Sequence, residues 1–207
     1  MGVFGIVVAG GILVSIALKV TAPIGTNVGD LPVVQAVRAD RSSPVAENEL
    51  ADVTVIIFTD YQCPVCRLAH PEMRRAIAGD GRVRIVYKDW PVFGVRSERA
   101  ARVAIASNYQ GIYPLVHDTL MSSGRVDEPS LKKAVEQSGG SWARLQVDLT
   151  RPAIDQQLAN NRLQAFGLGL RGTPGYLIGP ILIRGGARSA QFSKAIAVAR
   201  KNLKRPK

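Results

Sequence analysis

The sequence contains very little cysteine and histidine. Its 207 residues include two of each, and two cysteines exclude the disulfide-dense scaffolds of small secreted proteins. Cysteine used this sparingly suits a protein whose one pair is repeatedly oxidised and reduced, because no spare thiol can trap it in a wrong disulfide. Apolar residues are not scarce. They make up 46% of the chain, enough for an ordinary core, and the length allows one domain with a tail or an insertion.

Acidic residues are also in deficit. Asp and Glu number 16 against 27 Lys and Arg, so the net charge is +11 and the isoelectric point is near 10.2, a balance that invites a nucleic-acid interpretation. The basic residues are scattered, however, and form no face interleaved with aromatics. The basic run 200–207 offers a contact with an anionic membrane surface, but a helix end that complements its own dipole is the simpler explanation. We therefore predict no nucleic-acid partner.

The chain starts with an uncharged apolar run. Residues 2–18 are dominated by Val, Ile, Leu, Ala and Gly, and as a helix they fall just short of the thickness of a bilayer core. A buried core helix is the alternative, but the position at the extreme N-terminus favours targeting. Residues 1–22 are thus predicted to be a transmembrane anchor or a signal segment, and Pro23 slightly favours an uncleaved anchor. Either option places the rest of the chain in a periplasmic or other extracytoplasmic compartment, where disulfide chemistry belongs.

The pattern changes twice along the first half of the chain. Residues 23–50 are rich in Pro, Gly, Asp, Ser and Asn, and they are predicted to be a linker with a short extended piece at Val33-Val34. The main domain is predicted over 51–207. It begins with Val53–Phe58, a run that is apolar on both faces and so predicts a central strand.

A helix and a second strand follow the first. The helical pattern starts at Cys63 and ends at Gly79-Asp80-Gly81, and it is interrupted at His70-Pro71, where the proline removes a helix N–H. Val83–Tyr87 is a strand by its alternation, and the chain is expected to leave the sheet at Lys88. Strand, helix and strand at this spacing predict a βαβ unit with parallel pairing.

A long helical block precedes the last strands. From about 97 to 166 the periodicity is helical throughout, with Ser97 as a cap, so we predict a helical insertion within the sheet-forming sequence. Two short apolar strands around Gly179-Pro180 predict a hairpin, and Ser189 caps a closing helix. The expected fold class is α/β.

The chemistry is concentrated in Cys63-Pro64-Val65-Cys66, where the first strand runs into its helix. Two thiols at this spacing can close a disulfide with little backbone movement. Cys63 meets the unpaired N–H groups and the positive end of the helix dipole, which favour its thiolate, whereas Cys66 lies one turn further in and should remain a buried thiol. Pro64 suits the first turn, where its missing N–H is not needed. These residues alone predict a thiol–disulfide oxidoreductase.

Three motifs in this order resemble the DsbA-like branch of the thioredoxin-fold thiol–disulfide oxidoreductases. They are Phe58-Thr59-Asp60-Tyr61-Gln62-Cys63-Pro64-Val65-Cys66, Lys88-Asp89-Trp90-Pro91, and Gly172-Thr173-Pro174 with its strands. The resemblance covers nearly everything from about Ala51 to Asn202. It implies a thioredoxin-like fold with a helical insertion, catalytic roles for Cys63 and Cys66, and no cofactor beyond the redox-active disulfide. It also implies unfolded or cysteine-containing protein substrates.

The resemblance further implies that Thr173-Pro174 is a cis peptide bond lying against the disulfide. Proline has no N–H to compete beside a reactive sulfur, so the backbone of Thr173 is free to pair with an extended substrate peptide. Val65 stands where the most oxidising members have a histidine, and it gives Cys63 neither charge nor a hydrogen bond. We therefore expect a less extreme oxidant, reoxidised by a membrane redox partner. Because Thr173 also occurs in members that reduce or isomerise disulfides, the reductase or isomerase direction stays open.

Two polar residues near the motif admit other interpretations. His70 lies four positions after Cys66 on the same helix face, and with both cysteines it would supply three metal ligands. A tetrahedral structural zinc site needs four, and His117, the only other histidine, sits in the helical block, so no metal site is predicted. His70 is instead expected beside the site, tuning its field. Asp60 is a candidate for proton transfer, although a turn residue after a strand is the default.

Two further classes of function fit the same residues. A non-catalytic chaperone would clasp unfolded peptides through the apolar surface near Pro174, with Tyr61, Trp90 and Phe93 in its groove, although single aromatics more often belong to a core or a rim. A structural domain would keep its disulfide permanently closed. Both predict activity without sulfur chemistry, whereas the enzyme depends on Cys63.

Overall fold

The computed structural model describes residues 24–203 of the chain. The predicted anchor or signal segment at 1–22, with its apolar run 2–18, lies outside these residues. Between residues 24 and 203 no helix has both the length and the apolar character needed to span a bilayer.

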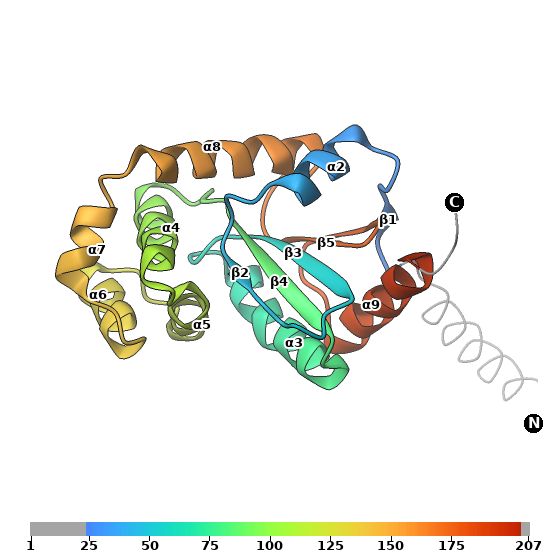
Figure 1. Ribbon diagram of the computed structural model, residues 1–207, viewed down its shortest axis with the longest axis horizontal. Coiled ribbons are helices and arrows are strands. Elements are labelled where there is room, and N and C mark those ends of the chain that lie inside the picture. Colours follow the sequence, from blue (N-terminus) through green and yellow to red (C-terminus); the bar gives the residue numbers. More distant parts are fainter. Residues whose placement is uncertain (1–23, 204–207) are drawn as a thin grey trace, which may run out of the picture.

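A mixed sheet forms the centre of the described chain (Figure 1). Its six strands lie in the order β1-β6-β5-β3-β4-β2, and their bounds are Thr26–Asn27 (β1), Val45–Ala46 (β2), Val53–Thr59 (β3), Val83–Asp89 (β4), Gly175–Ile178 (β5) and Ile181–Arg184 (β6). β3 and β4 pair in parallel, which confirms the predicted βαβ unit, and the other pairs are antiparallel. The predicted hairpin is present as β5 and β6.

Helices cover both faces of this sheet. Their bounds are Pro32–Ala39 (α2), Pro64–Asp80 (α3), Val95–Ser107 (α4), Tyr113–Ser123 (α5), Glu128–Gln137 (α6), Trp142–Asp148 (α7), Pro152–Gly167 (α8) and Ser189–Leu203 (α9). Figure 1 shows α3 and α9 on one side of the sheet and α2 and α8 on the other, with α4 to α7 grouped beyond one end of it. The helices from α4 to α8 are the predicted insertion, so the architecture is a thioredoxin-like fold with a helical insertion.

The two helical layers follow from the sequence of β3. Alternate residues of a strand point to opposite faces. Val55 and Ile57 belong to the core that also contains residues of α3 and α9, whereas Ile56 and Phe58 belong to a second core shared with α2 and α8. Because both faces are covered, the strand is an uninterrupted apolar run.

The linker predicted over 23–50 is wrong for the described residues 24–50, which dock on the sheet. β1 pairs with β6 and β2 pairs with β4, and the piece predicted to be extended at Val33-Val34 lies inside α2. Lys88 is fully buried and its Nζ lies 2.6 Å from Asp40 Oδ2, which also accepts from Gln164 at 2.8 Å. The strands are two residues long, too short for a periodic signal, and distant contacts hold the segment in place.

Three smaller expectations also differ from the structure. α3 continues through Pro71 without interruption, because the packing of its buried face outweighs one missing hydrogen bond. β4 extends through Lys88 to Asp89, so the chain leaves the sheet two residues later than expected. α4 begins at Val95, and the Ser97 hydroxyl donates to the side chain of Asp60 instead of capping the helix.

Candidate active site

The two cysteines lie at the junction between β3 and α3. β3 ends at Thr59, and the Cys63 N–H donates to the Asp60 carbonyl oxygen at 3.2 Å, which closes a tight turn. Cys63 has the extended backbone of a helix N-cap, with φ −70° and ψ 115°, and Pro64 takes the first helical position. The sequence therefore places one sulfur at the mouth of the helix, as predicted.

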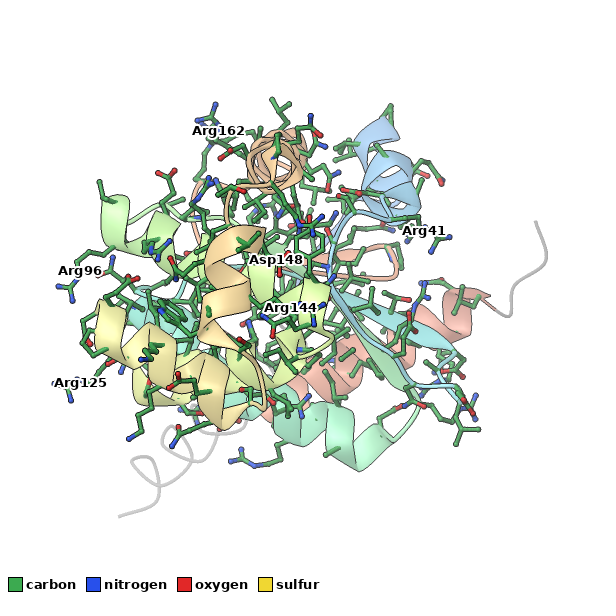
Figure 2. The ribbon with its side chains drawn as sticks, turned by 60° about the vertical axis from the view of Figure 1, so that its left-hand side comes forward. Arg41, Arg96, Arg125, Arg144, Asp148 and Arg162 are labelled. Atoms are coloured by element: carbon green, nitrogen blue, oxygen red, sulfur yellow. The ribbon has the colours of Figure 1, made fainter. Side chains whose placement is uncertain are left out.

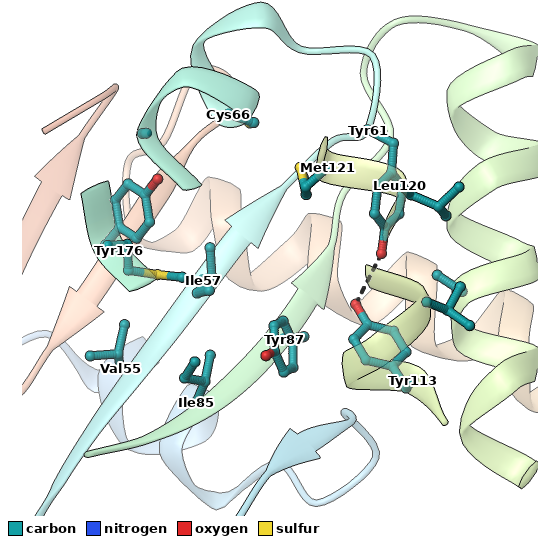
Figure 3. Packing of buried hydrophobic residues seen from close by; sticks show 14 of the residues in the cluster. Val55, Ile57, Tyr61, Cys66, Ile85, Tyr87, Tyr113, Leu120, Met121 and Tyr176 are labelled. Carbon is teal, nitrogen blue, oxygen red and sulfur yellow. Dashed lines mark hydrogen bonds between the residues drawn. The ribbon is translucent and has the colours of Figure 1, made fainter. Parts of the chain in front are cut away.

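The two sulfurs face each other across the first turn of α3. The Cys63 Sγ accepts a hydrogen bond from the Cys66 N–H at 3.4 Å, and both cysteines are free thiols. Each residue is 2% exposed, so a partner reaches the sulfurs only through direct contact with this corner. Figure 3 shows Cys66 on the helix near Tyr176 of β5, in the core cluster that also contains Ile57.

The surroundings shift the pKa values of the two thiols in opposite directions. A hydrogen bond from the Cys66 thiol is the largest influence on the pKa of Cys63. Together with the Thr173 side chain and the helix-end amides, it overcomes burial and lowers that pKa to about 6. Burial raises the pKa of Cys66 well above its ordinary value. At neutral pH the site thus holds one thiolate and one thiol. The helix-end amides contribute, as expected, but the second sulfur contributes more.

The Thr173-Pro174 bond is cis, as predicted, and the strand pairing explains why it lies beside the sulfurs. Gly175, which follows directly, is in register with Phe58 of β3, and the Pro174 carbonyl oxygen accepts from the Gly185 N–H at 2.8 Å. The Cys63 Sγ lies 3.3 Å from the Thr173 carbonyl oxygen, to which the protonated thiol donates. β3 and β5 therefore bring together two segments separated by more than a hundred residues.

The Thr173 hydroxyl is placed to act on the sulfurs. It is buried and has no hydrogen-bond partner among residues 24–203, and its side chain lowers the pKa of both Cys63 and Cys66. A buried hydroxyl without a fixed partner can turn its proton toward a sulfur that becomes charged.

Asp60 organises the turn before the cysteines. Its carboxylate accepts from the N–H groups of Gln62 at 2.8 Å, Val92 at 2.6 Å and Phe93 at 3.2 Å, and from the Ser97 hydroxyl. These bonds join the cysteine turn to the loop between β4 and α4. A carboxylate with four donors is held in place as a structural acceptor, which favours the turn role over proton transfer.

Apolar side chains border the sulfurs on the solvent side. Pro64 is exposed, Val65 is 43% exposed, and Leu68, one turn further along α3, is 75% exposed. A surface hollow of about 440 Å³ adjoins them and is lined by Pro64, Arg67, Leu68, His70, Pro71, Met121 and Ser122. Of the three aromatics proposed for a groove, Tyr61 and Trp90 are buried in the core, and Phe93 alone is on the surface.

His70 contacts α5, and the metal set with Cys63 and Cys66 is not formed. Its Nε2 lies 3.2 Å from Asp118 Oδ1, and its ring centroid is 5.3 Å from that of His117. Over residues 24–203, the metal-capable group that includes His70 contains His117 and Asp118 and neither cysteine.

Sequence reasoning missed a buried polar network behind the turn. The Tyr113 hydroxyl lies 3.3 Å from the Tyr61 hydroxyl (Figure 3). It donates to Asp89 Oδ2 at 2.8 Å, and the Tyr61 hydroxyl is 3.0 Å from His117 Nδ1. Burial raises the pKa of Asp89 to about 7. The acidic residue at the end of an apolar strand was the available signal, but its partners come from α5 and so depend on the tertiary fold.

The positive charge is spread over separate elements. Figure 2 labels exposed arginines that project from different parts of the surface, on α4, α7, α8 and two loops (Arg96, Arg144, Arg162, Arg41 and Arg125). A hollow of about 400 Å³ between α2, β2 and α9 is lined by Arg38, Arg41 and Arg84 but also by Asp40, Glu47 and Asp52. Charges of both signs meet there, so it offers no anion site.

The chain matches a family model described as DSBA-like thioredoxin domain over residues 54–197. Several solved structures resemble it, among them three thioredoxin-like or thiol-disulfide exchange proteins. A thioredoxin-like oxidoreductase from Silicibacter pomeroyi is 35% identical, with a TM-score of 0.76 over 81% of this chain and 97% of that one. A periplasmic thioredoxin-like protein from Salmonella enterica serovar Typhimurium is 25% identical, with a TM-score of 0.72 over 82% and 96%. The thiol-disulfide exchange protein α-DsbA2 from Wolbachia pipientis is 25% identical, with a TM-score of 0.73 over 80% and 93%.

Two curated relatives are longer proteins. A Na+/H+ antiporter of Salinispora tropica is 31% identical over 108 residues, which are 51% of this chain and 16% of the antiporter. A second antiporter, from Salinispora arenicola, is 29% identical over 149 residues, which are 70% of this chain and 21% of that protein. The chain therefore spans about a sixth to a fifth of the length of these two relatives.

Proposed function

The chain belongs to the DsbA-like thioredoxin domain family, and on that premise we propose that it exchanges disulfides with cysteine-containing proteins through Cys63 and Cys66. The observation that carries the proposal is the contrast between the two sulfurs. Cys63 has a lowered pKa at the mouth of α3, and Cys66 has a raised one beneath it. Thiol–disulfide exchange requires one sulfur that acts as nucleophile and leaving group, and a second thiol beside it that resolves the mixed disulfide.

The oxidising cycle begins from the closed Cys63–Cys66 disulfide. A substrate thiolate attacks the Cys63 sulfur, the sulfur–sulfur bond breaks, and Cys66 leaves with the electron pair and takes up a proton. The substrate is then joined to Cys63 in a mixed disulfide. A second substrate thiolate attacks the substrate's own sulfur, the substrate disulfide forms, and Cys63 departs as a thiolate. Its lowered pKa favours this departure, since a more acidic thiol leaves faster.

We assign substrate positioning to the cis-proline loop. Pro174 presents no N–H beside the sulfurs, and the backbone of Thr173 borders Cys63 directly. An extended peptide that pairs with this backbone would hold its cysteine against the Cys63 sulfur, in the manner of strand addition. The exposed apolar side chains of Val65 and Leu68 suit unfolded segments with apolar residues near their cysteines.

Net oxidation is the proposed direction of electron flow. A stabilised Cys63 thiolate favours the reduced dithiol, which makes the disulfide form the better oxidant. Val65 adds neither charge nor a hydrogen bond, so the potential is expected to be less oxidising than that of the strongest family members. Equilibration with a glutathione buffer measures this. A potential in the range of thioredoxin, about −270 mV, would instead support a reductase, and one near about −180 mV an isomerase.

The proposed setting is extracytoplasmic, with residues 1–22 as anchor or signal. An oxidising compartment keeps such a disulfide available, and one of the similar structures is described as periplasmic. A membrane redox partner would restore the disulfide after each turnover. No nucleotide, flavin or metal enters the exchange itself.

Single cysteine variants test the proposal. Cys63→Ser should abolish oxidation of a reduced, unfolded test protein, while Cys66→Ser should accumulate a mixed disulfide through Cys63 that mass spectrometry can identify. Ser42→Ala, which changes a hydroxyl far along the chain from the motif, is the control and should turn over like the parent. If both cysteine variants keep full activity, the chain acts as a peptide-binding or structural domain and the exchange proposal is wrong.

A further inference from the structure

Both histidines of the chain meet at one place. His70 lies on α3, one turn after Cys66, and His117 lies on α5 beside Asp118. One donor atom from each of these three side chains lies within 4.8 Å of the other two. Since the chain has only two histidines, their convergence from separate helices is the feature to explain.

One nitrogen of the His117 ring is held by a buried hydroxyl. Its Nδ1 lies 3.0 Å from the Tyr61 hydroxyl, which leaves Nε2 as the nitrogen available to a metal. The ring also packs against Tyr87, with centroids 4.6 Å apart. A hydrogen bond on the nitrogen that does not bind metal is the usual arrangement of metal-binding histidines, because it sets the tautomer and holds the ring.

Two buried oxygens beside the imidazoles have no hydrogen-bond partner. Asp118 Oδ1 contacts His70 Nε2 at 3.2 Å, but without hydrogen-bond geometry, and the Tyr87 hydroxyl is also unpartnered among the described residues. Buried polar side-chain atoms are mostly paired in folded proteins. Asp118 Oδ1 therefore has only the His70 contact, and the Tyr87 hydroxyl points to a partner that is not one of these residues.

We propose that His70, His117 and Asp118 bind one Zn²⁺ ion. Two imidazoles and a carboxylate are a donor set that zinc accepts, with water in a fourth position, whereas Mg²⁺ and Ca²⁺ prefer sets made of oxygen alone. Tetrahedral ligands at about 2.0–2.1 Å from the ion lie about 3.3 Å from one another. The three donors must close by up to about 1.5 Å, and Asp118, whose side chain is 34% exposed, has room to move.

Arg74 opposes the ion and provides a test of opposite sign. Its guanidinium lies 3.4 Å from Asp118 Oδ2, and its side chain is 45% exposed, so it can turn away into solvent. A positive charge at this distance weakens the binding of a cation. Removing the charge should therefore tighten zinc binding, which a purely structural polar cluster would not show.

A bound ion would brace the helix that carries the dithiol. It would link α3 to α5 and, through the contact of His117 with Tyr61, to the segment that leads into Cys63. The ion takes no part in thiol–disulfide exchange, so this inference does not depend on the proposed function.

Imidazole nitrogen NMR on the full-length chain tests the site without any substitution. The chain is first oxidised, so that Cys63 and Cys66 cannot coordinate zinc. One equivalent of ZnCl₂ should then shift the resonances of both imidazoles, and MgCl₂ at the same concentration should leave them in place. If zinc moves neither imidazole, or if Mg²⁺ produces the same change, the site does not exist as proposed.

Variants on the oxidised chain supply the second measurement. His70→Gln and Asp118→Asn should each weaken zinc binding at least about tenfold in a chelator competition, and Arg74→Gln should strengthen it. Asp30→Asn, which alters an exposed carboxyl elsewhere, is the matched control and should bind like the parent. Thermal unfolding without zinc checks that each variant folds. Equal binding by the parent, His70→Gln and Asp118→Asn would overturn the proposal.

Discussion

The corner that holds the sulfurs and the docking edge, which is the β4 side of the sheet where β2 and Asp40 dock, are built in opposite ways. At the docking edge, the buried Lys88 ammonium meets the Asp40 carboxylate at 2.6 Å, and Gln164 donates to the same oxygen. At the sulfur corner, the Thr173 hydroxyl is buried without a partner among the described residues. The difference teaches that a buried ion pair fixes the docked segment, whereas the unpartnered Thr173 hydroxyl remains available to a sulfur that changes its charge.

Breaking the ion pair at the docking edge should cause the largest loss of stability. Lys88→Met leaves the Asp40 carboxylate, whose side chain is 12% exposed, without its cation, and a loss of about 3 kcal/mol in the free energy of unfolding is expected. Urea unfolding monitored by circular dichroism measures it. The titration of Cys63 should not change, because Lys88 makes no contact with the sulfur corner.

Two controls sharpen this prediction. Lys132→Met removes a half-exposed partner of Glu136 and should change stability by less than about 1 kcal/mol. The double variant Lys88→Met, Asp40→Asn should recover part of the loss, since it leaves no buried charge. A double variant no better than the sum of its singles would mean that the pair is not coupled.

Asp89 is a buried carboxyl with too few hydrogen-bond partners, and we expect its burial to make stability depend on pH. Burial raises its pKa from 3.8 to about 7, so the folded chain holds a proton that the unfolded chain releases. This contribution destabilises the fold as pH rises from about 4 to 7, and it levels off above 7. At about 1.4 kcal/mol per pKa unit, Asp89→Asn should gain up to about 4 kcal/mol over the parent at pH 8 and little at pH 4.

The difference between parent and variant across the pH range is the measurement for Asp89. Asp155→Asn, at a carboxyl that is 64% exposed, should show no comparable pH-dependent gain. A variant less stable than the parent at pH 8 would mean that Asp89 is charged and well solvated by its network.

The Thr173 hydroxyl should have the smallest effect, confined to the sulfur corner. Thr173→Val keeps the shape of the side chain and removes the hydroxyl, so the pKa of Cys63 should rise by about one unit, which is about 1.4 kcal/mol of thiolate stabilisation. Thiolate absorbance near 240 nm follows the titration. Thr173→Ser should restore the parent pKa. A parent-like titration in Thr173→Val would mean that the hydroxyl does not stabilise the Cys63 thiolate.

The sequence predicts those parts of the fold whose signals are local. β3, the hairpin and the start of α3 follow from apolar runs, turn residues and Pro64 at the first helical position. The docking of residues 24–50 could not be predicted in this way, because β1 and β2 are only two residues long and the partners of Asp40 lie on β4 and α8.

The candidate site divides in the same way. Both cysteines and the direction of the asymmetry between them can be predicted from their place at a helix start, but its largest cause, the hydrogen bond from Cys66, was not predicted. The cis bond at Pro174 is implied by the family resemblance. The contacts of His70 with α5, and of Asp89 with Tyr113, depend on how the helical insertion packs against the sheet. No short stretch of sequence encodes that packing.

The central claim is that the geometry of the site makes the Cys63 sulfur reactive and keeps Cys66 as a protonated thiol. The most direct test is the rate of iodoacetamide alkylation of the reduced chain against pH, with each cysteine followed by peptide mass spectrometry. We predict that Cys63 is modified with a midpoint near pH 6 while Cys66 stays unmodified up to pH 9. Equal modification of both cysteines, or a midpoint at the ordinary thiol value near 9, would contradict the account.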